Sequence, residues 1–509
     1  MATTQPVDGD SAGTFLGHPK GLFVLFFAEM WERFSYYGMR ALLIFYLTKH
    51  WLFSDSDAGI IYGAYTALVY ITPVVGGYLA DKYLGQRKAV LFGAVLLTLG
   101  HFFMAFEGDP AAGTENNPIV YVFWLALALI IVGSGFLKAN ISVIVGQLYP
   151  RTDTRRDAAY TIFYMGINLG AAIGSLLCGY IGETYGWAYG FGLAGIGMLA
   201  GLVVFVWGKP LLLGRGEPPK QLAKKTEWSM YGVGIALVGV CWLAIQYQDM
   251  VGYVLGLFGG SLVLYVLFIA VVKLPSEERD RIFAAMFLIL TSIVFWALFE
   301  QAGSSLNLFT DRHVDRGGVP ASTFQSINAI YIILLAPVFA VTWQTLGRKG
   351  LEPSAPLKFG LGIVQVGLGF LVLVWGAQSV GMDAAVPVLF IFLIYLLHTT
   401  GELCLSPVGL SAMNRLAPSH MASLIMGTWF FASATGNFAA GLIASATGAE
   451  GVGEEAGKQV VLDVYSTVGW YAIAIGVGVM VISPLIKKLT HIVTLQDDDV
   501  GDDLLGQSE

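Results

Sequence analysis

Fourteen apolar runs of about 20 residues divide this 509-residue chain, and they constrain its fold more than any other feature. A run of that length crosses the hydrocarbon core of a bilayer as an α-helix, at a rise of about 1.5 Å per residue. Hydrophobic residues make up 56% of the chain and charged residues only 12%, a composition that excludes an ordinary soluble enzyme. We therefore predict an all-α polytopic membrane protein with transmembrane helices near residues 20–48, 57–82, 89–106, 118–148, 157–184, 187–208, 228–248, 251–272, 280–310, 322–346, 357–377, 386–414, 420–447 and 464–486.

Lysine and arginine are distributed unevenly over the connections between these runs. With an even number of spans, both termini lie on one side, and twenty-one basic residues fall on that side. The opposite side has only four, namely Lys49, Arg312, Arg316 and Lys458. By the positive-inside rule, this bias predicts that both termini are cytoplasmic.

Two basic connections divide the chain into parts. The segment GKPLLLGRGEPPKQLAKKTEW follows the sixth run, and VVKLPSEERDR follows two further runs that have few charged residues. We predict a cytoplasmic N-terminal tail (1–19), a six-helix bundle (20–208), a basic linker with two inserted transmembrane helices (209–279), a second six-helix bundle (280–488) and an acidic cytoplasmic tail (489–509). This organisation resembles the major facilitator superfamily, as does GGYLADKYLGQRK (76–88), which is similar to a cytoplasmic loop typical of that superfamily.

The first apolar run carries four charged residues, Glu29, Glu32, Arg33 and Arg40. At 3.6 residues per turn, their spacing places all four on roughly one side of the helix. Each would cost about 2.5–3.5 kcal/mol at the bilayer centre if it faced lipid. We therefore expect the four side chains to line a polar cavity or to pair with one another.

Few other polar side chains interrupt the apolar runs. Lys138, Glu300 and Glu402 are ionisable, and such residues inside a membrane are by default functional. Asn168 and Asn328 leave two interpretations open, a functional contact or a hydrogen bond that only packs two helices. The three cysteines lie in apolar runs, which makes a disulfide framework unlikely.

The intramembrane charges do not balance. Glu29, Glu32, Glu300 and Glu402 face only three bases, Arg33, Arg40 and Lys138. One carboxylate is therefore unmatched, which suggests that the site takes up a proton. Because cations can hold a carboxylate and the spare acid an amine, a zwitterion would suit this site as a substrate.

Five motifs in order resemble one family, the bacterial proton-dependent oligopeptide transporters of the major facilitator superfamily. Residues 29–37 reproduce its first-helix signature ExxERFxYY. The runs FYMGINLG (163–170), FWALFEQAGSSL (295–306), GELCLSPVGL (401–410) and GTWFFASATGN (427–437) are similar to its fifth, seventh, tenth and eleventh helices. The resemblance implies a symporter that imports di- and tripeptides by alternating access, driven by the inward proton gradient.

The resemblance also implies roles for single residues. The peptide carboxylate would be held by Arg40 and Lys138, the amino end by Glu402, and the backbone by Asn168 and Asn328. The side chains that would line the peptide cavity are Tyr36, Tyr37, Tyr70, Trp296, Trp429 and Ser433, for which ordinary core packing is the alternative. The proton-coupling set would be Glu29, Glu32, Arg33, Lys138 and Glu300, and Arg40 with Glu300 would form a gate.

The family's animal members carry a histidine in the second helix, where this chain has Gly63, so we exclude a histidine trigger at that position. His101 and His398 lie outside the matched motifs, and we interpret both as satisfied interhelical histidines. We expect no cofactor other than the co-transported proton, no metal, and partners limited to peptides, protons and the lipid bilayer, with no nucleic acid.

Three rival functions are weighed against peptide symport. A proton-coupled carrier for nitrate or another small anion or zwitterion is the alternative, although the intact ExxER carboxylates argue against it. A drug exporter would not need an amine-and-carboxylate pair, and a membrane-embedded enzyme would need a nucleophile with its base or a metal motif, which these helices lack. We therefore predict a transporter, not an enzyme, that functions as a monomer in the bacterial cytoplasmic (inner) membrane.

Overall fold

The computed structural model describes residues 13–109, 117–150, 153, 155–220, 222–448 and 453–491. Most of the predicted acidic tail, from residue 492 on, and most of the N-terminal tail lie outside the described residues. Within the described residues the fold is all-α apart from four two-residue strands. These pair as β1 (Thr14–Phe15) with β2 (His18–Pro19), antiparallel, and β3 (Val314–Asp315) with β4 (Val386–Pro387), parallel.

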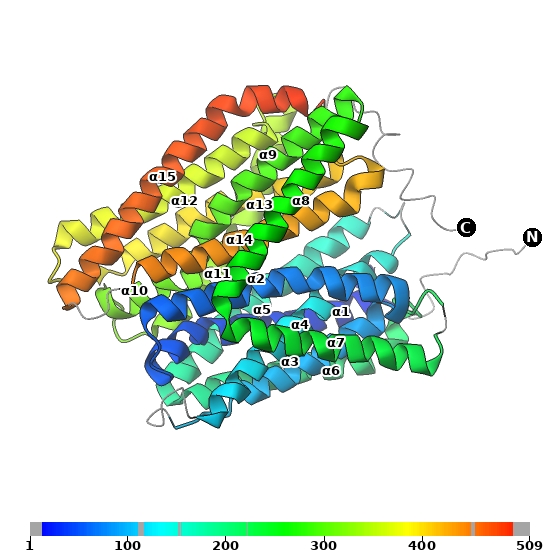
Figure 1. The fold of residues 1–509 in the computed structure, drawn as a ribbon, viewed down its shortest axis with the longest axis horizontal. Coiled ribbons are helices and arrows are strands. Elements are labelled where there is room, and N and C mark those ends of the chain that lie inside the picture. The colour runs from blue at the N-terminus through cyan, green and yellow to red at the C-terminus, as the bar shows by residue number, and fades with distance from the viewer. Residues whose placement is uncertain are drawn as a thin grey trace, which may run out of the picture. The chain divides into compact units, whose positions relative to one another are not determined.

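Fourteen long helices in the described part of the chain correspond one by one to the predicted apolar runs (Figure 1). They are α1 (Lys20–Phe45), α2 (Asp55–Leu79), α3 (Gln86–Met104), α4 (Pro118–Gln147), α5 (Arg155–Tyr185), α6 (Trp187–Trp207), α7 (Lys224–Gln246), α8 (Gln248–Lys273), α9 (Ser276–Phe299), α11 (Ser326–Arg348), α12 (Ala355–Val380), α13 (Leu389–Leu416), α14 (Ala422–Ala446) and α15 (Glu454–Leu489). The predicted fold class is confirmed.

Several helices are broken or extended by short irregular turns. A 3-10 turn, η5 (Glu300–Gly303), joins α9 to the short helix α10 (Ser305–His313). One π-helical turn, η1 (Tyr46–His50), extends α1, and another, η2 (Ala80–Leu84), extends α2. The other short turns are η4 (Lys209–Leu212), η6 (Ala321–Gln325) and η7 (Ser419–Met421).

Twelve of the long helical segments are long and apolar enough to cross a membrane by composition alone. The other two, α1 and α14, are exceptions for different reasons. Every 18-residue stretch of α1 holds at least three charged residues, because Glu29, Glu32, Arg33 and Arg40 lie near its centre. The α14 sequence has no charge, but Asn437 and many Gly, Ser and Thr residues lower its mean hydropathy.

The chain divides into two compact units. Unit 1 comprises residues 1–43, 71–246 and 322–329, and unit 2 comprises residues 44–70, 247–321 and 330–509. In unit 1, α4 packs against α3, α5 and α7, and α6 packs against α3 and α5. In unit 2, α12 lies beside α13 and α15, while α14 packs against α8 and α9 (Figure 1). Nothing in these contacts tests the predicted five-part organisation, which stays a prediction.

Candidate functional site

A ridge of glycines on α5 positions α1 in unit 1. Gly166, Gly170 and Gly174 recur every four residues and therefore share one face of α5. A Cβ at Gly170 would collide with the carbonyl oxygen of Met30, and a Cβ at Gly174 with that of Phe34. The backbones of the two helices thus touch, as small residues allow in membrane proteins. This contact fixes the rotation of α1.

The neighbouring face of α1 presents the predicted charged stripe. Glu29 and Glu32 are fully buried and Arg33 is 9% exposed. The Nε of Arg33 donates a 2.7 Å hydrogen bond to Oε1 of Glu29, one turn earlier on the same helix. The same Nε lies 3.2 Å from Oε2 of Glu32, an ion pair without hydrogen-bond geometry. One guanidinium therefore serves two buried carboxylates.

The carboxylate of Glu32 is the less satisfied of the two. Among the described residues, neither of its oxygens accepts a hydrogen bond, and Oε2 of Glu29 accepts none either. Buried charged oxygens that lack donors carry a large desolvation cost. Within α1, Arg33 alone therefore leaves one of these two negative charges uncompensated.

Lys138 of α4 lies close to this acidic pair. Its Nζ stands 4.0 Å from the ring centroid of Tyr36, within cation–π distance. The charges of Glu29, Glu32, Arg33 and Arg40 all act on it electrostatically. Unit 1 therefore brings together every basic residue that the sequence places within the membrane.

Arg40 lies two turns after Arg33 on the same side of α1. It is 7% exposed, and its Cζ is 5.9 Å from the ring centroid of Tyr37. Tyr37 in turn packs edge-on against Tyr36, at 5.2 Å between ring centroids. The α1 stripe is thus a continuous row of alternating charges and phenol rings.

The two predicted asparagines lie near α5 in unit 1. Asn168 is buried and donates through Nδ2 to the carbonyl of Tyr164, 3.0 Å away on its own helix. Asn328 is half-buried, and the next residue, Ala329, packs on Ala171 and Ala172 of α5. This hydrogen bond uses the side-chain nitrogen of Asn168, so its side-chain oxygen Oδ1 is available to a ligand.

In unit 2, Glu300 begins the η5 turn and is only 5% exposed. Trp296 lies one turn before it on α9 and packs edge-on against Phe295 and Phe299. Glu300 caps the C-terminal end of α9, where its backbone N–H still donates to the carbonyl oxygen of Trp296, and the η5 turn begins at the same residue. The structure therefore places the predicted gate carboxylate at a discontinuity between two helices.

A polar cluster that the sequence analysis did not identify supports this turn. Gln301 donates through Nε2 to the carbonyl oxygens of Ala297 and Ala440, both at 2.9 Å. Ser305 donates to Oε1 of Gln301 at 2.6 Å, and its hydroxyl lies 2.8 Å from that of Tyr465. The polar residues beside Glu300 in the sequence FEQAGSS were the available signal, since buried polar side chains need partners.

The remaining predicted cavity residues of unit 2 differ in burial. Trp429 is 4% exposed and packs over Gly409 and Phe359. Ser433 donates to the carbonyl of Trp429 at 3.2 Å, a bond within α14. Glu402 on α13 and Tyr70 on α2 are half-buried. These contacts fit a packing role for Trp429, while its role in peptide binding stays a prediction.

Three positions concern histidines. A Cβ at Gly63 would lie 2.6 Å from the Cα of Gly441, so close packing of α2 on α14 leaves no room for a side chain there. His398 is satisfied, with Nε2 3.2 Å from the carbonyl oxygen of Val366 on α12. The same interpretation is wrong for His101, which is fully buried and has no hydrogen bond from either ring nitrogen among the described residues. The reason is that the side chain lies in the interior of the protein, where no polar group of the described residues forms a hydrogen bond with its ring nitrogens.

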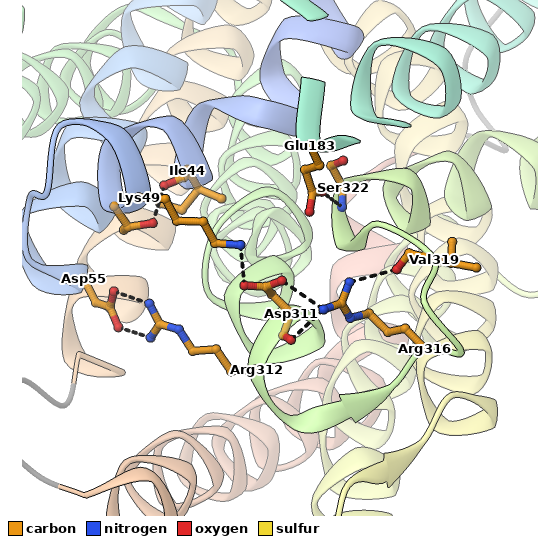
Figure 2. A network of polar contacts seen from close by, with 10 residues as sticks. Ile44, Lys49, Asp55, Glu183, Asp311, Arg312, Arg316, Val319 and Ser322 are labelled. Carbon is orange, nitrogen blue, oxygen red and sulfur yellow. Dashed lines mark hydrogen bonds and ion pairs between the residues drawn. The ribbon is translucent and has the colours of Figure 1, made fainter. Parts of the chain in front are cut away.

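Ion pairs join the end of α10 to the start of α2 and to the η1 turn in unit 2 (Figure 2). One carboxylate oxygen of Asp311 lies 2.7 Å from Nζ of Lys49, and the other lies 3.1 Å from Nη2 of Arg316. Arg312 binds both carboxylate oxygens of Asp55. Three of the four bases predicted on the side opposite the termini therefore lie in one cluster, which the sequence analysis did not predict.

The described residues hold no group of three or more His, Cys, Asp or Glu side chains arranged to bind a metal ion. The ionisable residues of the predicted site are divided between the two units. Unit 1 holds the α1 stripe with Lys138, and unit 2 holds Glu300 and Glu402.

Comparison with known proteins gives consistent matches. A family model described as "POT family" matches residues 87–456. The peptide transporter YePEPT of Yersinia enterocolitica is 39% identical over 459 residues, covering 84% of this chain and 88% of the relative. A di-/tripeptide transporter of Lactococcus lactis is 32% identical over 450 residues, covering 83% and 88%.

Solved structures match over similar lengths. A POT family transporter crystallised with a thioalcohol-conjugated peptide has a TM-score of 0.79 and 33% identity to this chain. The match covers 93% of this chain and 98% of that transporter. The helices of the major facilitator fold are therefore shared along almost the whole length of the chain.

Proposed function

Because the chain belongs to the POT family, whose members are transporters and not enzymes, we propose that it imports di- and tripeptides together with protons. The observation that carries this proposal is the buried Glu29–Arg33–Glu32 group, in which two carboxylates share one guanidinium. The named relatives transport peptides, di- and tripeptides among them. The direction is inward across the bacterial cytoplasmic membrane, with both termini in the cytoplasm, and the working unit is the monomer.

The proton binds to the acidic pair of α1. Glu32 is our preferred site, since its carboxylate accepts no hydrogen bond among the described residues. In the deprotonated state, Glu29 and Glu32 compete for Lys138, which lies within electrostatic reach of both. Protonation removes one negative charge, and Lys138 is then available to a peptide carboxylate. Arg33 stays as the fixed counter-charge.

Arg40 and Lys138 take the peptide carboxylate, and Glu402 takes the amino group. Arginine suits this role because its planar fork can bind both carboxylate oxygens. Asn168 and Asn328 contact the peptide backbone. The aromatic side chains Tyr36, Tyr37, Tyr70, Trp296 and Trp429, with Ser433, receive the peptide side chains.

Alternating access depends on a charge pair that opens and closes. Arg40 and Glu300 form the gate in this proposal, and either protonation of Glu300 or capture of Arg40 by a peptide releases it. The driving force is sufficient. One proton entering gains about 2.3 kcal/mol per 100 mV and about 1.4 kcal/mol per pH unit, which supports a tens- to hundreds-fold accumulation of peptide.

The function is tested by uptake of labelled dialanine into proteoliposomes with an imposed inward proton gradient. We expect accumulation that a protonophore abolishes and that unlabelled di- and tripeptides compete away. Nitrate or another small anion in place of the peptide should not compete. Uptake no greater than in the protonophore control, or no competition by peptides, would refute the proposal.

The proton site is tested by Glu32→Gln, which keeps the shape of the side chain but cannot bind and release a proton. This variant should exchange peptide between compartments of equal pH, yet fail to concentrate it under a proton gradient. The matched control is Glu455→Gln, which alters an exposed carboxylate outside the proposed site. Normal gradient-driven accumulation by Glu32→Gln would place the proton elsewhere.

A further inference from the structure

The connection between α6 and α7 is strongly basic and continues into the first turn of α7. Residues 208–225 hold one acid, Glu217, and five exposed bases, Lys209, Arg215, Lys220, Lys224 and Lys225. Glu227 follows within the first turn of α7. In this respect the connection differs from the paired charges of the ion-pair cluster in Figure 2.

Both acids of this region are neutralised by bases that belong to α3. The Nε of Arg87 donates to Oε1 of Glu217 at 2.5 Å, and Nη2 donates to Oε2 at 3.2 Å. The Nζ of Lys88 donates to Oε1 of Glu227 at 2.7 Å. Among the described residues, the side chains of Arg215, Lys220, Lys224 and Lys225 make no ion pair and no hydrogen bond; these four residues are called the basic strip below.

The backbone that carries the basic strip is held in place. The N–H of Arg87 donates to the carbonyl oxygen of Gly216 at 2.8 Å. The N–H of Gly216 donates to Oε1 of Gln147, at the end of α4, also at 2.8 Å. The connection is therefore fastened at Gly216, beside Arg215, to the ends of α3 and α4, and α7, which carries Lys224 and Lys225, packs against α4.

Two tryptophans flank the basic strip at the ends of the helices that it joins. Trp207, the last residue of α6, is 81% exposed, and Trp228, in the second turn of α7, is 72% exposed. Both helices are long and apolar enough to span a membrane. Exposed tryptophan at the end of a spanning helix is typical of the headgroup level of the bilayer. The basic strip therefore lies at the depth of the lipid phosphates.

From this geometry we propose that the basic strip is a binding site for anionic phospholipid headgroups. Its cations are exposed, uncompensated and placed at headgroup depth, which is the chemistry that attracts a negatively charged lipid surface. Lys224 and Lys225 do not stabilise α7, since cations in the first turn of a helix oppose the helix dipole. A lipid phosphate bound nearby would offset this unfavourable interaction. This site is independent of the peptide site.

The test uses the full chain in nanodiscs of phosphatidylcholine with increasing fractions of phosphatidylglycerol. Ala223 is exposed, and the three native cysteines are buried, so Ala223→Cys gives one labelling position for an environment-sensitive fluorophore. We expect a saturable signal with phosphatidylglycerol and none with phosphatidylcholine alone. One Lys or Arg contributes roughly a fivefold change in affinity at a membrane surface. Neutralising all four strip residues to Gln should therefore raise the half-saturating lipid fraction by more than fivefold.

The matched control removes the same charge from other exposed bases that make no ion pair among the described residues, by changing Arg348, Lys349, Lys487 and Lys488 to Gln. An equal shift in that control, no preference for phosphatidylglycerol in the wild type, or displacement by millimolar inorganic phosphate would each overturn the proposal. If the variant with the neutralised strip fails to insert into the membrane, the proposal is tested instead by measuring the phosphatidylglycerol preference of the wild type at high salt. The preference should vanish at about 1 M salt, where the screening length is about 3 Å, and its persistence would also overturn the proposal.

Discussion

Replacing Gly170 with alanine tests whether the contact between α1 and α5 positions the charged stripe. A Cβ at this position would collide with the carbonyl oxygen of Met30 and would lie 3.0 Å from the Cβ of Arg33. The carbonyl belongs to a helix backbone and cannot rotate away as a flexible side chain could. To relieve the overlap, α1 must therefore move away from α5 and carry Arg33 with it.

The magnitude follows from two opposing terms. Overpacking of a tight interior costs typically about 1–3 kcal/mol. The helix itself gains about 0.8–1 kcal/mol when glycine becomes alanine. Gly192→Ala in α6 shows the helix gain alone, because nothing lies within 4 Å of a Cβ at that position and no overpacking occurs there. The difference between the two variants should then be about 1–3 kcal/mol, with Gly170→Ala the less stable.

Thermal unfolding of the purified variants measures this difference. A cost of 1 kcal/mol lowers Tm by about 2–4 °C in a unit of 150–250 residues. We therefore expect Gly170→Ala to melt several degrees below Gly192→Ala, and its gradient-driven peptide uptake to fall while Gly192→Ala stays near wild type. Equal melting temperatures and equal uptake for the two variants would refute the argument that this contact positions Arg33.

Three further predictions concern side-chain contacts. The hydrogen bonds from Arg87 hold the pKa of Glu217 below its ordinary value of 4.5, so the stability from this pair is present above pH 4.5 and is lost as the pH falls through the lowered pKa. The Tm difference between wild type and Glu217→Gln should accordingly shrink in acid below pH 4.5, and a constant difference would contradict the pairing. Lys458 donates to the carbonyl oxygens of Ala384 at 2.7 Å and Gly381 at 3.0 Å; Lys458→Met should cost roughly 1.5–3 kcal/mol in chemical denaturation, whereas Lys349→Met, at an exposed position, should cost little. Asp55→Asn breaks the partly exposed pair with Arg312 and should lower the free energy of unfolding by at most about 1 kcal/mol. This loss should disappear at high salt. A larger or salt-independent loss would contradict the description of this contact as a weak surface ion pair.

The sequence was sufficient for the helices because membrane insertion depends on local composition. Each apolar run has to satisfy its own backbone hydrogen bonds as a helix, so the apolar runs locate all fourteen helices, twelve of which are apolar enough by composition alone to span a membrane. The same argument identified the α1 stripe, since Glu29, Glu32 and Arg33 are conspicuous in an apolar run. It could not predict that one guanidinium hydrogen-bonds Glu29 and only approaches Glu32, which depends on side-chain conformation.

Other features were beyond the reach of the sequence because they depend on which helices touch. The sequence predicted a satisfied His101, yet neither ring nitrogen of this buried side chain has a hydrogen-bond partner among the described residues. The support of the η5 turn comes from Ala440 and Tyr465, more than 130 residues away in the chain. Long-range partners of this kind leave no local pattern.

The sequence by itself therefore determined that the chain is a helical membrane protein, which runs become helices, and which charged residues must be sheltered from lipid. The physical reason is that exposing backbone polar groups or charges to hydrocarbon is costly, and each segment must avoid this cost through its own composition. Only the tertiary structure decided how α1 is rotated against the glycines of α5, and which acids of the α6–α7 connection are already paired. Those outcomes depend on close packing between segments distant in the chain, where a single Cβ or one arginine from another helix changes the result.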